Sequence, residues 1–223
     1  MRMIKFRIHD QNLRIIPNGV DTDKFSVKGK GSYLDKYLKN VIDYKKVIFV
    51  GRLDLQKGVE YLMRAIPEVI NNFTNVHFFI LGNGRLERNL KILAKSIAIE
   101  KYVTFIDLIP LEDMPKFYSA ADIFCLPSIH EGFPLSIVEA LSMGLIVVAS
   151  NTGGIPDVII ENENGFLFKP KNIKQLSIKM LKALNLSHEE NFQIQQNNIQ
   201  KAYRTYSWNK IVDEIINIYL ESN

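Results

Sequence analysis

The 223-residue chain has little cysteine and no long apolar run. Its single cysteine, Cys125, cannot form a disulfide within the chain, which is typical of a reducing compartment. No segment approaches the length of about 18 apolar residues that suggests a membrane-spanning helix, and residues 1–10 lack the pattern of a secretory leader. We therefore expect a soluble, cytoplasmic protein.

Several motifs of common enzyme classes are also missing. The first strong strand is not followed by the glycine-rich fingerprint of a dehydrogenase, and the chain contains neither a P-loop nor a serine nucleophile elbow. The four histidines have no ligand spacing, so we predict no metal site and no cofactor.

The charge balance is mild. There are 28 lysines and arginines against 24 acidic residues, which gives a net charge of +4. No basic strip with interleaved aromatic residues is present, so we expect no nucleic-acid partner. The positive charge is compatible with peripheral association at the inner face of a membrane, but does not identify an anionic partner.

Apolar runs and helical patterns alternate along most of the chain. The runs predict strands over 47–50, 76–81, 102–106, 122–126, 145–149 and 165–168. The patterns predict helices over 57–71, 86–98, 112–120, 134–143, 155–160, 172–184, 188–204 and 207–221. This alternation is typical of an α/β, Rossmann-like parallel sheet with helices on both faces, here followed by C-terminal helices. Ligands bind such sheets at the carboxyl ends of the strands. We expect the loops 51–57, 82–84, 106–110, 127–134 and 150–154 along that edge.

The chain is organised around residues 128–140, which lead from a strand through a short loop into a helix. Pro134 is expected in the first helical turn, where its missing N–H is tolerated. The N–H groups of Leu135 and Ser136 are expected to be free. Together with the positive end of the helix dipole, they would suit a phosphate or another anion.

Glu131 and Glu139 are the two carboxylates of this stretch. If the chain between them were wholly helical, the two, eight positions apart, would be separated by about 12 Å along the axis. That separation favours contacts with different parts of an extended ligand over the flanking of one bond, as in a glycosidase. Glu139 shares its side of the helix with apolar residues, so we expect it to have a polar partner. The alternative is that both are ordinary helix glutamates without a role in ligand binding.

Arg52 and Lys57 lie on the loop after the first strong strand, with Gly51 and Gly58 beside them. A guanidinium and an ammonium together suit a diphosphate, although a solvated loop is the alternative. The segments Gly82-Asn83-Gly84 and 152–154 open the backbone to close approach by a ligand or by another part of the chain. His130 is more consistent with a spacer than with a catalytic base.

Six motifs follow one another along the chain: Ile16–Asp21, Gly51-Arg52 with Lys57-Gly58, Gly82–Gly84, Ala121-Asp122, Glu131–Pro134 with Glu139-Ala140, and Gly153–Pro156. Together they resemble the C-terminal, donor-binding half of a GT-B glycosyltransferase of the retaining family 4, or group 1, type. The resemblance covers roughly residues 14–185.

The resemblance implies a UDP-, GDP- or ADP-sugar as donor and transfer of a hexose with retention, without a metal. It assigns catalytic roles to Glu131, Arg52 and Lys57, with the two cations neutralising the donor diphosphate. Glu139 would hold the ribose, and the backbone near Ile106 would line the base. The remaining donor-binding residues that it implies are Gly51, Gly82, Asn83, Gly132, Phe133, Pro134, Leu135 and Ser136.

The same resemblance divides the chain. Residues 1–24 would be the end of a missing N-terminal domain and the interdomain hinge, and residues 25–223 the donor-binding domain. The acceptor site would belong to the missing domain or to a partner chain, so we expect an enzyme that is incomplete and inactive or weakly active alone. A non-catalytic nucleotide-sugar-binding subunit is the alternative. Asp107 and Asp157 depart from the family pattern, which usually has Gly and Glu there.

Overall fold

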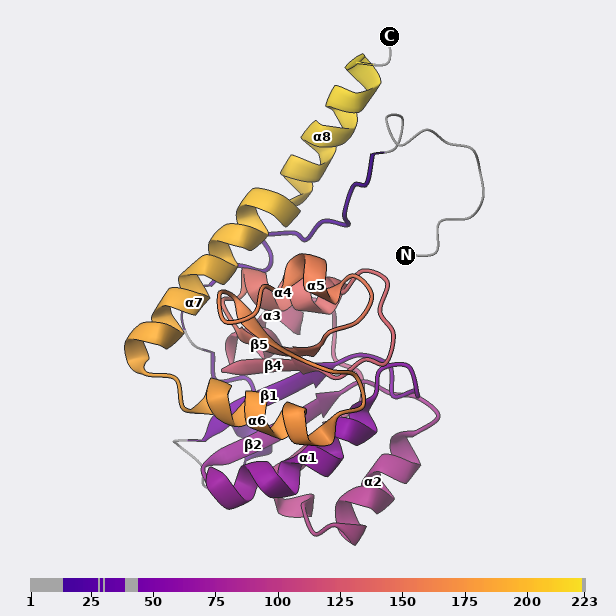
Figure 1. Cartoon of the computed structure of the whole chain (residues 1–223), viewed down its shortest axis with the longest axis vertical. Helices are drawn as coiled ribbons and strands as arrows, with labels where there is room; N and C mark the ends of the chain where they lie inside the picture. The colour runs from indigo at the N-terminus through magenta and orange to yellow at the C-terminus, as the bar shows by residue number, and fades with distance from the viewer. Residues whose placement is uncertain (1–13, 28, 30, 39–43, 222–223) are drawn as a thin grey trace.

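The computed structural model describes residues 14–27, 29, 31–38 and 44–221. Most of the segment assigned to a missing domain and hinge, residues 1–13, lies outside the described residues. Six parallel strands form one sheet in the order β3-β2-β1-β4-β5-β6 (Figure 1). The strands are β1 (Lys45–Val50), β2 (Val76–Leu81), β3 (Val103–Ile106), β4 (Ile123–Leu126), β5 (Ile146–Ser150) and β6 (Gly165–Phe168). The predicted α/β class and parallel sheet are confirmed.

Helices cover both faces of this sheet. Figure 1 shows one layer below the sheet and another above it. The lower layer consists of α1 (Val59–Asn72), α2 (Glu87–Ser96) and α6 (Ile173–Leu184). The upper layer contains α3 (Met114–Ser119), α4 (Leu135–Ser142) and α5 (Ile155–Val158), and α7 (His188–Lys201) packs against α4. Short 3-10 turns occur at η2 (Asp35–Tyr37) and η3 (Glu100–Tyr102).

The strand sequences fit this two-sided cover. Every residue of β2 and of β5 is buried, as expected for strands that lie between two helix layers. Helix α1 buries Val59, Leu62 and Ile66, which recur at the helical period on one side. This periodicity explains why the predicted elements match the observed ones to within a few residues.

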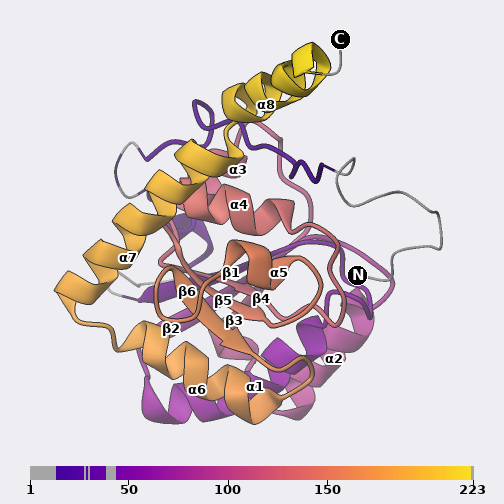
Figure 2. The same ribbon diagram turned by 45° about the horizontal axis from the view of Figure 1, so that its top comes forward.

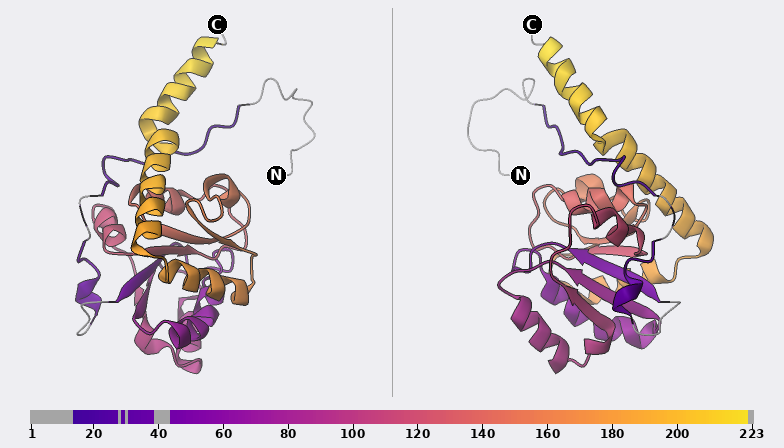
Figure 3. Two further views of the ribbon diagram at one scale, coloured as in Figure 1. Left: turned by 60° about the vertical axis from the view of Figure 1, so that its left-hand side comes forward. Right: turned by 180° about the vertical axis from the view of Figure 1, so that it is seen from behind.

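The C-terminal helices depart from the prediction. The helix expected over 188–204 ends at Lys201, and a π-helical turn, η4 (Ala202–Tyr206), joins it to α8 (Trp208–Glu221). Helix α8 projects from the body of the domain, as both views of Figure 3 show. It leaves a row of exposed apolar side chains: Trp208, Val212, Ile216, Tyr219 and Leu220. None of the helices in the described part of the chain combines the length and the apolarity that a membrane crossing requires.

The segment before Val20 is fastened to the start of α8. The Val20 N–H donates to the Tyr206 carbonyl at 2.7 Å, and the Trp208 N–H donates to the Val20 carbonyl at 3.1 Å. Gly19 lies against the indole of Trp208, where an added Cβ would be only 2.7 Å from a ring carbon. The two segments therefore leave the domain from one junction, which we call the Val20–Ser207 junction after its β-bridge.

Candidate functional site

The loops at the carboxyl ends of the strands are held to one another by their backbones. The linking hydrogen bonds run from Leu53 N–H to Asn83 O (2.8 Å), Gly82 N–H to Ile106 O (3.0 Å), Ile129 N–H to Gln56 O (2.7 Å) and Gly154 N–H to Glu131 O (3.2 Å). This network confirms that the five predicted loops share one edge. In the same network, the Ile106 and Asn83 carbonyl oxygens accept hydrogen bonds from the Gly82 and Leu53 N–H groups.

The glycines of these loops are explained by close packing between chain segments. Gly153 has φ +56°, and a Cβ there would lie 1.6 Å from the Glu131 carbonyl oxygen. Gly82 has φ +133°, and its Cβ would lie 2.0 Å from the Gly51 carbonyl oxygen. Gly132 differs, because an added Cβ would have no heavy atom within 4 Å. The sequence allowed either a ligand or another part of the chain to approach the backbone at 82–84 and 152–154. The structure shows that another part of the chain does so at both places.

Glu131 forms a nearly buried ion pair with Lys57. The Lys57 Nζ lies 2.6 Å from Glu131 Oε2, and the two side chains are only 18% and 9% exposed. Ser128 Oγ donates to the same carboxylate oxygen at 3.1 Å. The sequence placed both residues on the functional edge but did not predict that they pair, and it gave Ser128 no role. Lys57 and Glu131 therefore act as one unit that joins the loops after β1 and β4.

Arg52 is the exposed member of the predicted cation pair. Its side chain is 72% exposed, and its Nη2 lies 3.2 Å from Asp54 Oδ2. The other oxygen of Asp54 accepts the Lys57 backbone N–H at 3.0 Å, which fixes the turn before α1. The loop thus carries one cation that is held in place and one that extends into solvent.

The start of α4 corrects two predictions. Pro134 precedes the helix as its N-cap, with φ −87° and ψ 77°, and Leu135 is the first helical residue. The Leu135 N–H is not free, because it donates to the Phe133 carbonyl at 3.1 Å. These values describe an inverse γ-turn centred on Pro134, which uses up that donor. Ser136 lies at the second helical position, where an N–H has no acceptor within its own helix.

Glu139 lies one turn into α4 and has the polar partner that its position predicted. The Tyr118 hydroxyl, from α3, donates to Glu139 Oε2 at 2.7 Å. Burial raises the pKa of Glu139, while the Tyr118 hydrogen bond and the charge of Lys24 oppose that rise. Glu131 lies in the loop before the helix, so the helical estimate of about 12 Å does not apply to the pair. Tyr118 was not selected from the sequence. Nothing in the sequence of a short helix such as α3 indicates that one of its side chains contacts a residue on another helix.

Two further residues of the loop after β4, Phe133 and His130, make packing and backbone contacts. The half-buried ring of Phe133 packs edge-on against Tyr206, with 5.9 Å between ring centroids. His130 is exposed, and its carbonyl accepts a hydrogen bond from Gln56 Nε2 at 3.2 Å. Within the described ranges, no three His, Cys, Asp or Glu side chains gather as a metal ion would require.

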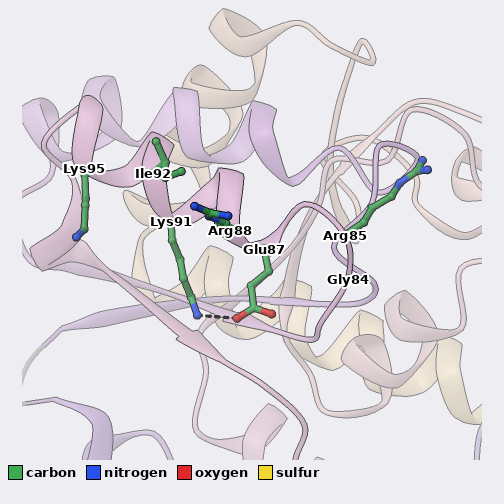
Figure 4. A pocket seen from close by; sticks show the side chains of 7 residues that line it. All are labelled: Gly84, Arg85, Glu87, Arg88, Lys91, Ile92 and Lys95. Atoms are coloured by element: carbon green, nitrogen blue, oxygen red, sulfur yellow. Dashed lines mark hydrogen bonds and ion pairs between the residues drawn. The ribbon is translucent and has the colours of Figure 1, made fainter.

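A cationic hollow of about 540 Å³ lies beside this edge, at Gly84 and along the outer side of α2 (Figure 4). Its charged side chains are Arg85, Glu87, Arg88, Lys91 and Lys95. Glu87 is paired with Lys91 at 2.6 Å, and Ile92, which is 54% exposed, lies among the cations. We call this surface the α2 basic face.

The comparisons with known proteins agree with the geometry. The family model described as "Glycosyl transferases group 1" matches residues 35–204. An Escherichia coli UDP-Gal:alpha-D-GlcNAc-diphosphoundecaprenol alpha-1,3-galactosyltransferase is 30% identical over 96% of this chain and 55% of its own length. The C-terminal domain of a group 1 protein from Francisella tularensis superposes with a TM-score of 0.76 at 24% identity, covering 85% of this chain and 100% of that domain. Anabaena HepE, solved with UDP-glucose, gives a TM-score of 0.84 at 23% identity, covering 96% of this chain and 59% of HepE. The chain spans about half the length of curated relatives that it matches.

The buried ion pair predicts a selective effect on stability. Lys57→Met should lower the free energy of unfolding by about 3–5 kcal/mol, because the Glu131 carboxylate keeps its buried position without a cation. The double variant Lys57→Met/Glu131→Gln should lose less. Lys91→Met is the matched control, because the Lys91–Glu87 pair has the same 2.6 Å separation at an exposed site and should cost less than about 1 kcal/mol. Urea unfolding measures all three, and equal losses for Lys57→Met and Lys91→Met would contradict this interpretation.

The glycines predict a second contrast. Gly153→Ala should lower the free energy of unfolding by more than about 2 kcal/mol, because its positive φ and the Glu131 carbonyl both exclude a Cβ. Gly132→Ala should stay within about 0.5 kcal/mol of the wild type, since its Cβ enters open space. The same unfolding experiment tests both, and a large loss for Gly132→Ala would show that this glycine has a packing role.

Proposed function

Because this chain belongs to the group 1 glycosyl transferases and covers the C-terminal domain of that family, we propose that its carboxyl edge binds a nucleoside diphosphate sugar. The complete enzyme would transfer a hexose from that donor to an acceptor, with retention and without a metal ion. The observation that carries the proposal is the Lys57–Glu131 ion pair, which joins two loops at the carboxyl edge of the sheet. Arg52 lies on the same loop as Lys57, and Glu139 lies on α4, the helix that follows the Glu131 loop.

The two cations would share the diphosphate unequally. An ammonium has three donors, and Lys57 gives one to Glu131, so two remain for phosphate oxygens. The Glu131 contact also fixes where those donors lie before any ligand arrives. Arg52, which extends into solvent, would close onto the outer phosphate with its planar fork. The Ser136 N–H at the start of α4 would add a donor from the helix end.

The sugar would lie over the loop that contains Glu131 and Gly132. A carboxylate accepts hydrogen bonds from sugar hydroxyls, and the open space beside Gly132 allows the ring to approach the backbone. Glu139 would accept from the ribose hydroxyls. Anabaena HepE, a structural neighbour, was solved with UDP-glucose, which supports a donor of this class.

In the transfer step that we propose, the bond from the anomeric carbon to the phosphate oxygen breaks, and a bond to the acceptor oxygen forms on the same face. The leaving phosphate takes the acceptor proton. Arg52 and Lys57 stabilise the charge that develops on the diphosphate, and such preorganised electrostatic stabilisation is usually the largest contribution to catalysis. Glu131 would act by holding the sugar and Lys57.

The acceptor would bind to a second domain, either on the same polypeptide or on a partner chain. Two observations support this: relatives are about twice as long as the matched region, and α8 presents exposed apolar side chains beyond the domain body. A nucleotide-sugar-binding subunit that requires such a partner is the second candidate. It predicts that the isolated chain binds the donor and neither transfers nor hydrolyses the sugar.

We also propose that the α2 basic face contacts the anionic inner face of a membrane. Arg88, Lys91 and Lys95 project from the helix that also carries the exposed Ile92, and Lys91 reaches Glu87 (Figure 4). Exposed cations on a helix that also has an exposed apolar side chain suit a surface of anionic headgroups, where each Lys or Arg contributes about 1 kcal/mol.

Calorimetric titration with UDP, GDP and ADP in the presence of a chelator tests the donor site. One of the three should bind, and Arg52→Ala should weaken it by about 1.5–3 kcal/mol, because a charge-assisted contact is lost. Arg64→Ala is the control, since Arg64 is an exposed α1 residue paired with Glu60. A strict need for Mg²⁺ would contradict the metal-free mechanism, and unchanged affinity in Arg52→Ala would contradict its phosphate role.

Co-sedimentation with phosphatidylglycerol-containing vesicles tests the membrane contact. Arg88→Glu/Lys95→Glu should weaken binding by about 2 kcal/mol or more, with binding also lost in high salt. The control Lys171→Glu/Lys174→Glu reverses the same number of exposed charges near α6. Equal losses in the two double variants would show a dependence on net charge alone, and equal binding to uncharged vesicles would contradict the electrostatic contact.

A further inference from the structure

Tyr118 is a fully buried side chain with one polar atom to satisfy. Its ring lies in an aromatic cluster with Phe25 and Phe124, at centroid distances of 5.8 and 5.9 Å. A buried tyrosine hydroxyl usually requires a hydrogen-bond partner. Here the hydroxyl donates to Glu139 Oε2 at 2.7 Å and lies 3.4 Å from the Ser136 carbonyl. The phenol is therefore anchored by packing and directed at α4.

Glu139 receives that hydrogen bond from a neighbouring helix. Figure 2 shows α3 and α4 close together on the same side of the sheet, which agrees with the contact. The buried side of α4 is otherwise almost entirely apolar, with Ile137, Val138, Ala140, Leu141 and Ser142. Among the described residues, the charged or titratable groups that act on Glu139 are Tyr118 from α3, through its hydrogen bond, and Lys24 from the segment before Phe25, through its charge.

We propose that Tyr118 is a positioning residue for the donor's ribose, because it fixes the Glu139 carboxylate through Oε2 and leaves the other oxygen to accept a ribose hydroxyl. The inference rests on the proposed function. A carboxylate held by a rigid phenol loses less conformational freedom when the ligand binds, so the hydrogen bond contributes to affinity without touching the ligand.

The same hydrogen bond favours the ionised carboxylate that accepts hydroxyls. Burial raises the pKa of Tyr118, and the adjacent Glu139 charge raises it further, so the phenol keeps its proton and remains a donor. Burial raises the pKa of Glu139, whereas the Tyr118 hydrogen bond lowers it. Loss of the hydroxyl would raise the Glu139 pKa further. Protonation would then begin at a higher pH as the solution is acidified.

The test compares wild type, Tyr118→Phe and Glu139→Gln by calorimetry, with the nucleoside diphosphate that binds best and with inorganic pyrophosphate. Tyr118→Phe should weaken nucleoside diphosphate binding by about tenfold, the loss of a hydrogen bond to a charged group, and leave pyrophosphate binding unchanged. The acid limb of its nucleotide affinity should move to higher pH. Tyr33→Phe is the matched control, because it also removes a tyrosine–carboxylate contact, 3.4 Å to Asp113, at the other end of α3.

The outcomes separate the inference from the function on which it rests. If the wild type binds no nucleotide, the donor-binding function itself fails. If Glu139→Gln weakens nucleotide binding and Tyr118→Phe matches the wild type, only the role of Tyr118 is overturned. Equal losses for nucleotide and pyrophosphate in Tyr118→Phe would also overturn it, because they indicate a general structural effect. Should Tyr118→Phe not fold, Glu139→Gln decides. Weaker nucleotide binding with unchanged pyrophosphate binding would support the proposal, whereas nucleotide affinity equal to that of the wild type would mean that Glu139 makes no ribose contact to be positioned and would overturn it.

Discussion

The ion pair between Lys57 and Glu131 joins two loops that are far apart in the sequence. A pair this deeply buried is stabilising only when its geometry is good and its remaining hydrogen-bonding groups are satisfied. Ser128 supplies a hydrogen bond to the carboxylate, and Asp54 fixes the turn that presents Lys57. The backbone must also come close enough, which Gly153 permits by allowing its segment to lie against the Glu131 carbonyl. Much of the carboxyl edge is thus arranged around one charged contact.

The two carboxylates of the site have different partners and therefore different properties. Glu131 is compensated by a cation, so the Lys57–Glu131 unit is close to neutral as a whole. Glu139 is paired with a phenol that has no charge, and Lys24 is the cation that acts on it. The two carboxylates therefore differ in charge compensation. Glu131 is matched by an ammonium in direct contact, whereas the direct partner of Glu139 is a neutral phenol.

The fold was predictable from the sequence because its signals are local. The strand over 76–81 is apolar except for His77, and α1 shows one apolar side. Alternation of such segments indicates a parallel sheet, whose topology places the loops on one edge. The sequence predicted that the loops carrying Arg52, Lys57 and Glu131 share one edge, but it did not predict the contacts that these residues make. Their roles in binding stay predictions. Pairing of Lys57 with Glu131 and the reach of Tyr118 to Glu139 depend on side-chain directions across separate elements. The γ-turn at Pro134 depends on φ and ψ values that the motif does not specify.

The Val20–Ser207 junction has a mechanical consequence. The segment before Val20 and helix α8 are tied together by backbone hydrogen bonds on both sides of the bridge, so they share a single pivot. Tyr206, at that pivot, also contacts the ring of Phe133 in the loop that carries Glu131. The Tyr206–Phe133 contact therefore links the base of both segments to the Glu131 loop. This link consists of two side chains and does not pass through the sheet.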